Sequence, residues 1–286
     1  MPPQADTIAA IATPPGQGAI GMIRLSGPEA IGLAARHFRG RSLSELPSHR
    51  VAVGAFHDEA NQWLDEVVAT VYRAPKSYTR EDVVELSAHG SPYILQRILN
   101  ALLAGGARLA EPGEFTMRAY LAGQMDLARA EAVADLISAE SAAAHRLAAS
   151  QFRGGISQRL GALRQSLMDF AGLLELELDF SEEDVTFAQR AQLIQTVGTT
   201  QQEVRRLAES FAAGNALKAG IPTVLVGKPN AGKSTLLNAL LQEDKALVSH
   251  IAGTTRDVIE DTLVIGGYTF RLMDTAGLRA DAEELE

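Results

Sequence analysis

The stretch TVLVGKPNAGKST occupies residues 223–235 and organises the C-terminal part of the chain. It predicts a short apolar strand, a loop bounded by Gly227 and Gly232, and a helix that begins near Ser234. The spacing G-x-x-x-x-G-K-S is a phosphate-binding loop, because its glycines let backbone N–H groups point at phosphate oxygens and the helix N-terminus adds partial positive charge. We expect Lys233 to reach the outer phosphates and Ser234 to bind Mg²⁺. The flanking strand and helix disfavour the alternative, a glycine-rich turn without a ligand.

A strand pair and an acidic strand end follow this loop. Strands are predicted at 258–265 and 268–273, joined by a Gly-Gly dipeptide that is typical of a hairpin. They lead into DTAG, where Asp274 is placed to hold Mg²⁺ through water and the Gly277 N–H is placed to reach a terminal phosphate. The pattern predicts the opening half of a nucleotide-binding α/β sheet.

The stretch GTTRD at 253–257 lies between the loop and the hairpin. A threonine at this place commonly closes over Mg²⁺ and the terminal phosphate as a switch. Taken alone, the stretch is explained equally well by an ordinary polar loop. The three stretches in this order are a strong signal for a triphosphate site.

Two features of other GTPase domains are missing from the sequence. Leu278 stands where Ras-like switches carry the Gln that positions the attacking water, so another group must orient it. Arg256 and Arg279 are candidates for charge stabilisation or are simply surface arginines. No Asn-Lys-x-Asp element for guanine follows Gly277, so we expect a chain truncated within the nucleotide-binding domain. The residues themselves indicate a nucleoside triphosphate site without naming the base.

Composition places the chain among water-soluble proteins of two or three domains. It has 286 residues, 46% hydrophobic content and a formal net charge of −9, which argues against a chain that coats naked nucleic acid by itself. It has no cysteine, which excludes disulfides and thiolate metal sites. No signal peptide and no run as long as a membrane span are visible, so no membrane is expected and the cytoplasm is the expected location.

Hydrophobic periodicity changes twice along the chain. Residues 1–120 mix strand-like and helical pieces and predict an α+β domain. Residues 121–215 carry apolar side chains at helical spacing and predict an incomplete α-helical bundle, a packing and dimerisation element. Residues 216–286 form the partial nucleotide-binding domain. The expected fold is therefore multidomain: α+β, helical bundle, and the first half of an α/β P-loop GTPase domain.

The motifs together resemble a known family. GKPNAGKST, GTTRD and DTAGLR are similar to the Era-related GTPases, and within them to the MnmE/TrmE family of tRNA-modification GTPases. The N-terminal blocks favour the MnmE/TrmE family among the Era-related GTPases. They are ATPPG at 12–16, RLSG at 24–27, SYTREDVVE at 77–85, and the run from EPGEFT to AEA at 111–132. Together with the nucleotide motifs, these N-terminal blocks span the chain from end to end.

The resemblance implies a folate-binding, dimerising first domain that holds 5-formyl- or methylene-tetrahydrofolate. By match, Arg24, Glu81 and Gln124 would contact it. The family usually has Lys where this chain has Gln124, Gly where it has Arg80, and Cys-His-Gly-Gly where residues 88–91 read AHGS. The change from Lys to Gln removes a positive charge near a carboxylated ligand. A structural ion pair would also explain the presence of Arg24 and Glu81.

The resemblance also implies a GTP site activated by K⁺ and by pairing of two nucleotide-binding domains. Mg²⁺ would be held by Ser234, Thr255 and, through water, Asp274, and K⁺ by Asn230, Ser249, Ile251 and Thr254. The expected catalytic residues are Asn230, Lys233 and Glu286, although Glu286 is equally explained as one of several carboxylates that open a helix. The full implied nucleotide site consists of Asn230, Ala231, Gly232, Lys233, Ser234, Thr235, Ser249, His250, Ile251, Ala252, Gly253, Thr254, Thr255, Asp274, Thr275, Ala276 and Gly277.

The implied function is GTP-dependent tRNA modification. Working with the flavoprotein MnmG in a heterotetramer, with FAD on that partner only, the homodimer would add a carboxymethylaminomethyl-type group at C5 of the wobble uridine of certain tRNAs, using a folate one-carbon unit. A ribosome-assembly GTPase would explain the nucleotide motifs but leave residues 1–120 unexplained. A folate-dependent methyltransferase is a weaker third alternative, because no nucleophile stands near Arg24 or Glu81.

Overall fold

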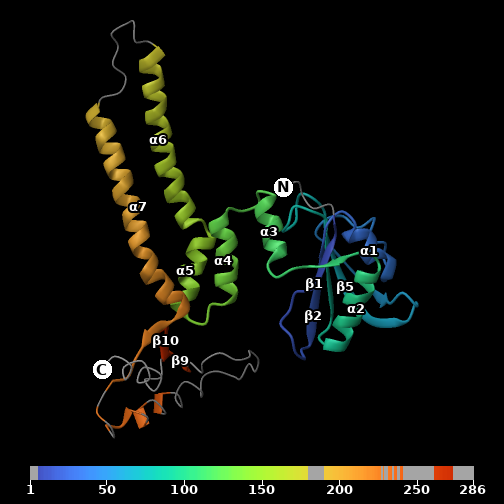
Figure 1. The fold of residues 1–286 in the computed structure, drawn as a ribbon. Coiled ribbons are helices and arrows are strands. Elements are labelled where there is room, and N and C mark those ends of the chain that lie inside the picture. Colours follow the sequence, from blue (N-terminus) through green and yellow to red (C-terminus); the bar gives the residue numbers. More distant parts are fainter. Residues whose placement is uncertain are drawn as a thin grey trace, which may run out of the picture. The chain divides into compact units, whose positions relative to one another are not determined.

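The computed structural model describes residues 6–179, 190–226, 228, 231–233, 235–236, 239–240 and 261–272. They belong to two compact units, Met1–Ala130 and Glu131–Glu286 (Figure 1). No helix in these ranges is both long enough and apolar enough to cross a bilayer. The predicted combination of α+β, helical and nucleotide-binding parts is confirmed. The finer boundaries at 120 and 215 stay predictions.

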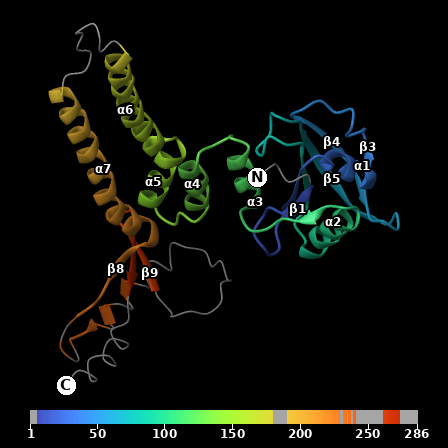
Figure 2. The same ribbon diagram turned by 45° about the horizontal axis from the view of Figure 1, so that its top comes forward.

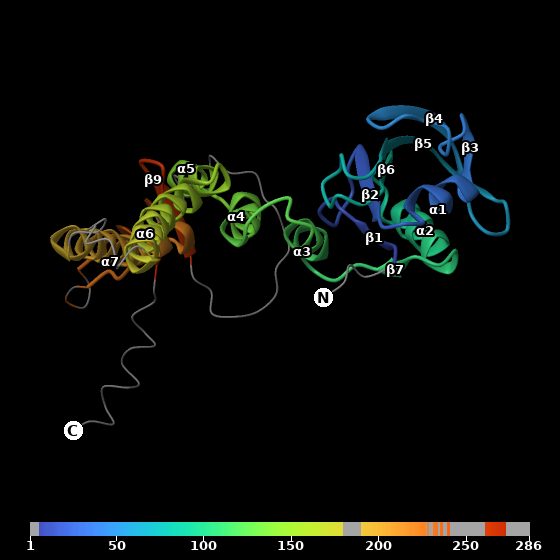
Figure 3. The same cartoon turned by 90° about the horizontal axis from the view of Figure 1, so that it is seen from above.

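The first unit is built on a seven-stranded sheet with the order β3-β4-β5-β6-β2-β1-β7. All neighbours are antiparallel except β1 and β7, which are parallel. Figure 3 shows the sheet curving around α1 and α2. The strands are β1 Ile8–Ile11, β2 Ile20–Ser26, β3 Phe38–Gly40, β4 Arg50–His57, β5 Trp63–Tyr72, β6 Val83–His89 and β7 Arg108–Leu109. The helices are α1 Ala30–His37, α2 Pro92–Ala104 and α3 Glu114–Leu121.

Alternation along the central strands separates a core face from a polar face. Side chains such as Ile23 and Leu25 on β2 and Leu86 on β6 are fully buried with Ile98 of α2, which explains the alternating apolar pattern. Gly21 permits close packing of α2, since a Cβ there would lie 2.4 Å from Leu95 Cδ1. The residues between these positions point to the opposite face, and the candidate site is built there.

In the described part of the second unit, four helices precede a small sheet, and the first of them begins at the end of the first unit. The helices are α4 Leu127–Ile137, α5 Ala142–Phe152, α6 Gly155–Asp179 and α7 Arg190–Ala219. Figures 1 and 2 show α6 and α7 side by side as two long helices, with α7 leading into the sheet. The strands β8 Ile221–Thr223, β9 Asp261–Ile265 and β10 Tyr268–Leu272 have the order β8-β10-β9, with β10 parallel to β8 and antiparallel to β9.

The predicted hairpin is present in the second unit. β9 and β10 pair with Val264 opposite Thr269 and Ile265 opposite Tyr268. Gly266 and Gly267 have φ of 60° and 82°, which is the left-handed backbone that a two-residue hairpin turn needs and that glycine adopts without strain. The parallel pairing of β8 with β10 is the arrangement expected of a nucleotide-binding α/β sheet.

Candidate functional site

The described part of the phosphate-binding loop has the predicted order of strand, turn and helix. β8 precedes it, Gly232 has a φ of 83°, and the Leu236 N–H donates to the Gly232 carbonyl at 2.9 Å as the helix begins. Lys233 Nζ donates to the Lys228 carbonyl at 2.9 Å, and the Ala231 N–H donates to the same oxygen at 3.2 Å. The lysine therefore lies across its own loop, where it can meet an anion seated on the backbone.

Most of the predicted nucleotide site lies outside the described residues. This holds for Asn230, Ser234, Glu286, residues 249–255 and residues 274–277. Of the predicted site, Ala231, Gly232, Lys233 and Thr235 are described. The assignments of Mg²⁺ ligands, K⁺ ligands and catalytic residues stay predictions.

The polar face of the first unit carries a half-buried cross-strand ion pair. Arg24 on β2 and Glu85 on β6 are directly opposite in register. Arg24 Nε and Nη2 donate to Glu85 Oε1 at 2.9 and 2.7 Å, and the Tyr72 hydroxyl donates to Glu85 Oε2 at 3.3 Å. Opposite charges directly across two strands stabilise the pairing and fix the guanidinium plane.

Two aromatic rings border the Arg24 guanidinium. Its carbon lies 5.4 Å from the centre of the Tyr78 ring and 5.6 Å from that of Phe115, distances typical of cation–π contacts. The Tyr78 hydroxyl lies 2.9 Å from Thr116 Oγ1 and so fastens the loop before Glu81 to α3. The result is a patch with a cation, a carboxylate and two aromatic faces.

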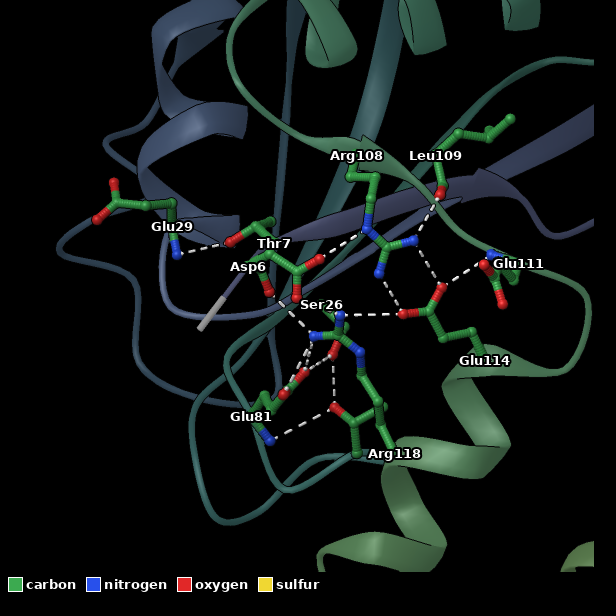
Figure 4. Close-up of polar contacts among 11 residues, drawn as sticks. Asp6, Thr7, Ser26, Glu29, Glu81, Arg108, Leu109, Glu111, Glu114 and Arg118 are labelled. Atoms are coloured by element: carbon green, nitrogen blue, oxygen red, sulfur yellow. Dashed lines mark hydrogen bonds and ion pairs between the residues drawn. The ribbon is translucent and has the colours of Figure 1, made fainter. Parts of the chain in front are cut away.

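Glu81 is held by a second, separate set of contacts (Figure 4). The Ser26 hydroxyl donates to Glu81 Oε2 at 2.6 Å, and Arg118 Nη1 lies 3.3 Å from each carboxylate oxygen. Ser26 lies 2.6 Å from the buried Thr79 hydroxyl, which can donate to it because the Ser26 proton is used on Glu81. The Glu81 side chain keeps 21% of its surface exposed, so it remains open to a ligand.

Arg118 on α3 joins three carboxylates that are far apart in the sequence. Besides Glu81, its Nη2 donates to Asp6 Oδ1 at 2.7 Å and to Glu114 Oε1 at 3.1 Å, and its Nη1 donates to the Asp6 carbonyl at 3.0 Å. Arg108 binds Asp6 and Glu114 from the other side, as Figure 4 shows. Arg118 is only 6% exposed and Glu114 only 2%, so the network has a buried centre, while Asp6 and Arg108 lie at its partly exposed edge.

The network shifts the protonation of its members. Burial alone would raise the pKa of Asp6, but hydrogen bonds from Arg108 and Arg118 hold that pKa below its ordinary value. The pKa of Glu114 is likewise lowered overall, because hydrogen bonds from Arg108, the Glu111 N–H and Arg118 outweigh burial. Burial lowers the pKa of Arg118, yet Glu114, Glu81 and Asp6 raise it overall. These groups are therefore held charged.

Gln124 and Arg80 lie at the far end of α3. The Gln124 N–H donates to the Ala119 carbonyl at 2.9 Å and the residue is exposed. Arg80 Nη1 donates to the Ala122 carbonyl at 3.1 Å, which connects the Glu81 loop with this end of the helix. Arg80 has a φ of 64°, in the left-handed region that favours glycine.

Arg24 and Glu81 each form a structural ion pair, as the alternative interpretation expected, but they do not pair with each other. The two residues belong to separate clusters, since Arg24 binds Glu85 and Glu81 binds Arg118. Sequence reasoning missed Glu85, Arg118 and the rest of the network. A signal existed for Glu85, a lone charge in the apolar strand VVELS that pairs with the strand of Arg24. No spacing in the sequence pointed to Arg118, which meets Asp6 across 112 positions.

Comparison with known proteins places both units. Residues 7–124 match the family model described as the GTP-binding protein TrmE N-terminus, and residues 127–281 match the MnmE helical domain. The chain is 56% identical over 281 residues to the tRNA modification GTPase MnmE of Cytophaga hutchinsonii, covering 98% of this chain and 61% of the relative. It is 55% identical over 284 residues to that of Christiangramia forsetii and 54% identical over 285 residues to that of Bacteroides fragilis, covering 98% of this chain and 60% and 61% of those relatives. The chain thus spans about three fifths of the length of the relatives it matches.

Proposed function

Because the chain belongs to the MnmE/TrmE family, we propose that it acts in a GTP-hydrolysing enzyme that modifies tRNA. The observation that carries the proposal is the presence, in one chain, of a phosphate-binding loop in the second unit and a polar site around Glu81 in the first. A ribosome-assembly GTPase leaves that second site without a role. A tRNA-modifying enzyme that takes a one-carbon unit from a folate uses both.

The loop supplies the charge chemistry of GTP hydrolysis. Gly232 turns the backbone so that N–H groups can face phosphate oxygens, and Lys233 adds a positive charge over them. When bound, Mg²⁺ and K⁺ would neutralise charge that develops on the phosphates, the first near Ser234, Thr255 and Asp274. Asn230, Ser249, Ile251 and Thr254 would hold the K⁺. Leu278 cannot orient water, so Glu286 is the proposed group for that task.

The residues around Glu81 fit a folate carrier. Glu81 is oriented by Ser26 and Arg118 and is partly exposed, so its oxygens can accept hydrogen bonds from the ring N–H groups of a pterin. Tyr78 and Phe115 supply ring faces beside the Arg24 guanidinium. The carrier, 5-formyl- or methylene-tetrahydrofolate, would supply the carbon, while these residues bind and orient it.

The proposal also covers the group added to the tRNA, the partner protein and the assembly. The enzyme would place a carboxymethylaminomethyl-type group on C5 of the wobble uridine of certain tRNAs, in the cytoplasm. A flavoprotein of the MnmG type would supply FAD in a heterotetramer, and two copies of this chain would pair through the N-terminal unit. The relatives' shared name, tRNA modification GTPase, supports the class of reaction.

Equilibrium binding tests the folate half of the proposal. We expect the 286-residue chain to bind 5-formyltetrahydrofolate in a calorimetric titration, and Glu81→Gln to weaken binding by roughly tenfold or more, because a charge-assisted hydrogen bond is worth about 1.5–3 kcal/mol. Glu45→Gln, at an exposed loop position, is the matched control. Absence of binding by the unsubstituted chain contradicts the folate role, whereas equal binding by Glu81→Gln contradicts only the assignment of this residue.

A further inference from the structure

Four arginines make hydrogen bonds or ring contacts with residues 78–82 or with α3, and three of them are committed to carboxylates. Arg24 binds Glu85, and Arg108 and Arg118 share the network of Asp6, Glu81 and Glu114. The fourth, Arg80, donates to the neutral carbonyl oxygen of Ala122. Within the described ranges, Arg80 is the member of the four that has no carboxylate partner. Its guanidinium therefore keeps N–H groups that a carboxylate of a ligand can engage.

The backbone at Arg80 is unfavourable for any side chain. A φ of 64° costs a non-glycine residue roughly 1 kcal/mol, so a glycine would fit this turn more easily. The Arg80 side chain is exposed and contributes no packing to the core that would offset this cost. The residue offers a charged group at the surface, held in one place by its hydrogen bond to Ala122.

The position of Arg80 is defined by its two neighbours. Its backbone precedes Glu81, and its guanidinium reaches the carbonyl two residues before Gln124. An elongated ligand that contacts Glu81 at one end and extends toward the end of α3 must pass beside this guanidinium. Gln124 itself is neutral and cannot balance an anionic end of such a ligand.

We propose that Arg80 binds the glutamate carboxylates of the folate carrier, an inference that rests on the proposed folate role of this site. A guanidinium matches a carboxylate with two parallel N–H···O bonds, which gives both affinity and orientation. Glu81 then holds the pterin end, and Arg80 holds the acidic end. The two neighbouring residues select for a ligand with both parts.

The test compares two ligands on matched variants. Calorimetric titration measures 5-formyltetrahydrofolate and the same molecule without glutamate, 5-formyltetrahydropteroate, on the unsubstituted chain, Arg80→Gly and Arg80→Gln. We expect both substitutions to weaken the folate roughly tenfold and to leave the pteroate unchanged. Arg36→Gln is the control, because Arg36 is also exposed and donates to a helix-end carbonyl, Gly105, away from the site. In Arg80→Gly, adding Gln124→Lys should restore most of the folate affinity.

The outcomes separate this inference from the proposed function. If the unsubstituted chain binds neither ligand, the folate role and this inference fall together. If it binds the folate and both Arg80 variants bind it equally well, Arg80 does not contact the ligand and only this inference is overturned. Equal loss of affinity for both ligands also overturns it, since Arg80 would then act on the shape of the Glu81 loop. Arg80→Gly should keep its melting temperature, because glycine adopts this backbone without strain.

Discussion

The phosphate-binding loop and the Glu81 site are built in opposite ways. The loop uses consecutive residues, and the hydrogen bonds of Lys233 and Ala231 to the Lys228 carbonyl join positions five and three apart. The Glu81 site joins Asp6, Glu81 and Arg118, whose contacts span 37 and 112 positions. A local site can be recognised from spacing alone, whereas a site made of distant side chains exists only once the sheet and α3 have assembled.

The sharpest challenge to this comparison is the removal of Arg118. We expect Arg118→Ala to lower the free energy of unfolding of the first unit by about 3–5 kcal/mol, because it leaves buried Glu114 without one of its cations and removes the cation that Glu81 and Asp6 share. Urea unfolding monitored by the fluorescence of Trp63, the chain's single tryptophan, measures the free energy of unfolding of this unit.

The control is Arg206→Ala, which removes an exposed pair with Glu203 on α7 and is followed by circular dichroism, because Trp63 reports only the first unit. A surface pair of this kind contributes little, so a change below about 1 kcal/mol is expected. Equal changes in the free energy of unfolding would mean that the network around Arg118 stabilises the first unit no more than a surface pair does. The Glu81 site would then not depend on its distant contacts for stability.

Lys233→Ala probes the local site. It should weaken binding of a fluorescent GTP analogue by roughly 30- to 100-fold, about 2–3 kcal/mol, since a hydrogen bond to a charged phosphate is lost. The Trp63 unfolding curve should stay in place, because Trp63 belongs to the first unit and Lys233 to the second. Lys228→Ala is the control, as it changes a side chain in the same loop without moving the carbonyl. A shift of the unfolding midpoint in Lys233→Ala would show that the loop, too, is structurally coupled to distant parts.

Acid should lower the stability of the first unit, because the Glu81 site contains the carboxylates Asp6 and Glu114, whose pKa values are lowered by folding. The folded-state pKa values of Asp6 and Glu114 are lowered, so the stability they contribute is present above their unfolded values near 3.8 and 4.5 and is lost as pH falls through the lower folded values. The urea midpoint of the Trp63 transition should therefore decrease below about pH 4.5. Glu114→Gln should flatten this decrease. An unchanged slope in that variant would assign the acid sensitivity to other carboxylates.

Sequence reasoning recovered most of the fold for a physical reason. Apolar strand-like stretches predicted the central strands, helical spacing predicted α2, α4, α6 and α7 but not α5, and Gly266-Gly267 predicted the hairpin, because each signal comes from neighbouring residues. The pairing order of the seven strands depends on which distant edges meet, and no local signal encodes it. For the same reason Arg24 and Glu81 were picked out only by resemblance, and their partners Glu85 and Arg118 were missed.

Ser141→Ala should give the smallest effect. It tests how much a contact between residues close in the sequence contributes to stability. Ser141 caps α5, its Oγ accepting from the Ala144 N–H at 3.2 Å, and an N-cap of this kind contributes about 1 kcal/mol. Ser141→Asp is the control that keeps an accepting oxygen and should retain most of the stability. Thermal unfolding monitored by circular dichroism measures the stability of both variants. A loss in Ser141→Ala as large as that in Arg118→Ala would break the comparison, because a contact across three residues would then stabilise its unit as much as one across 112.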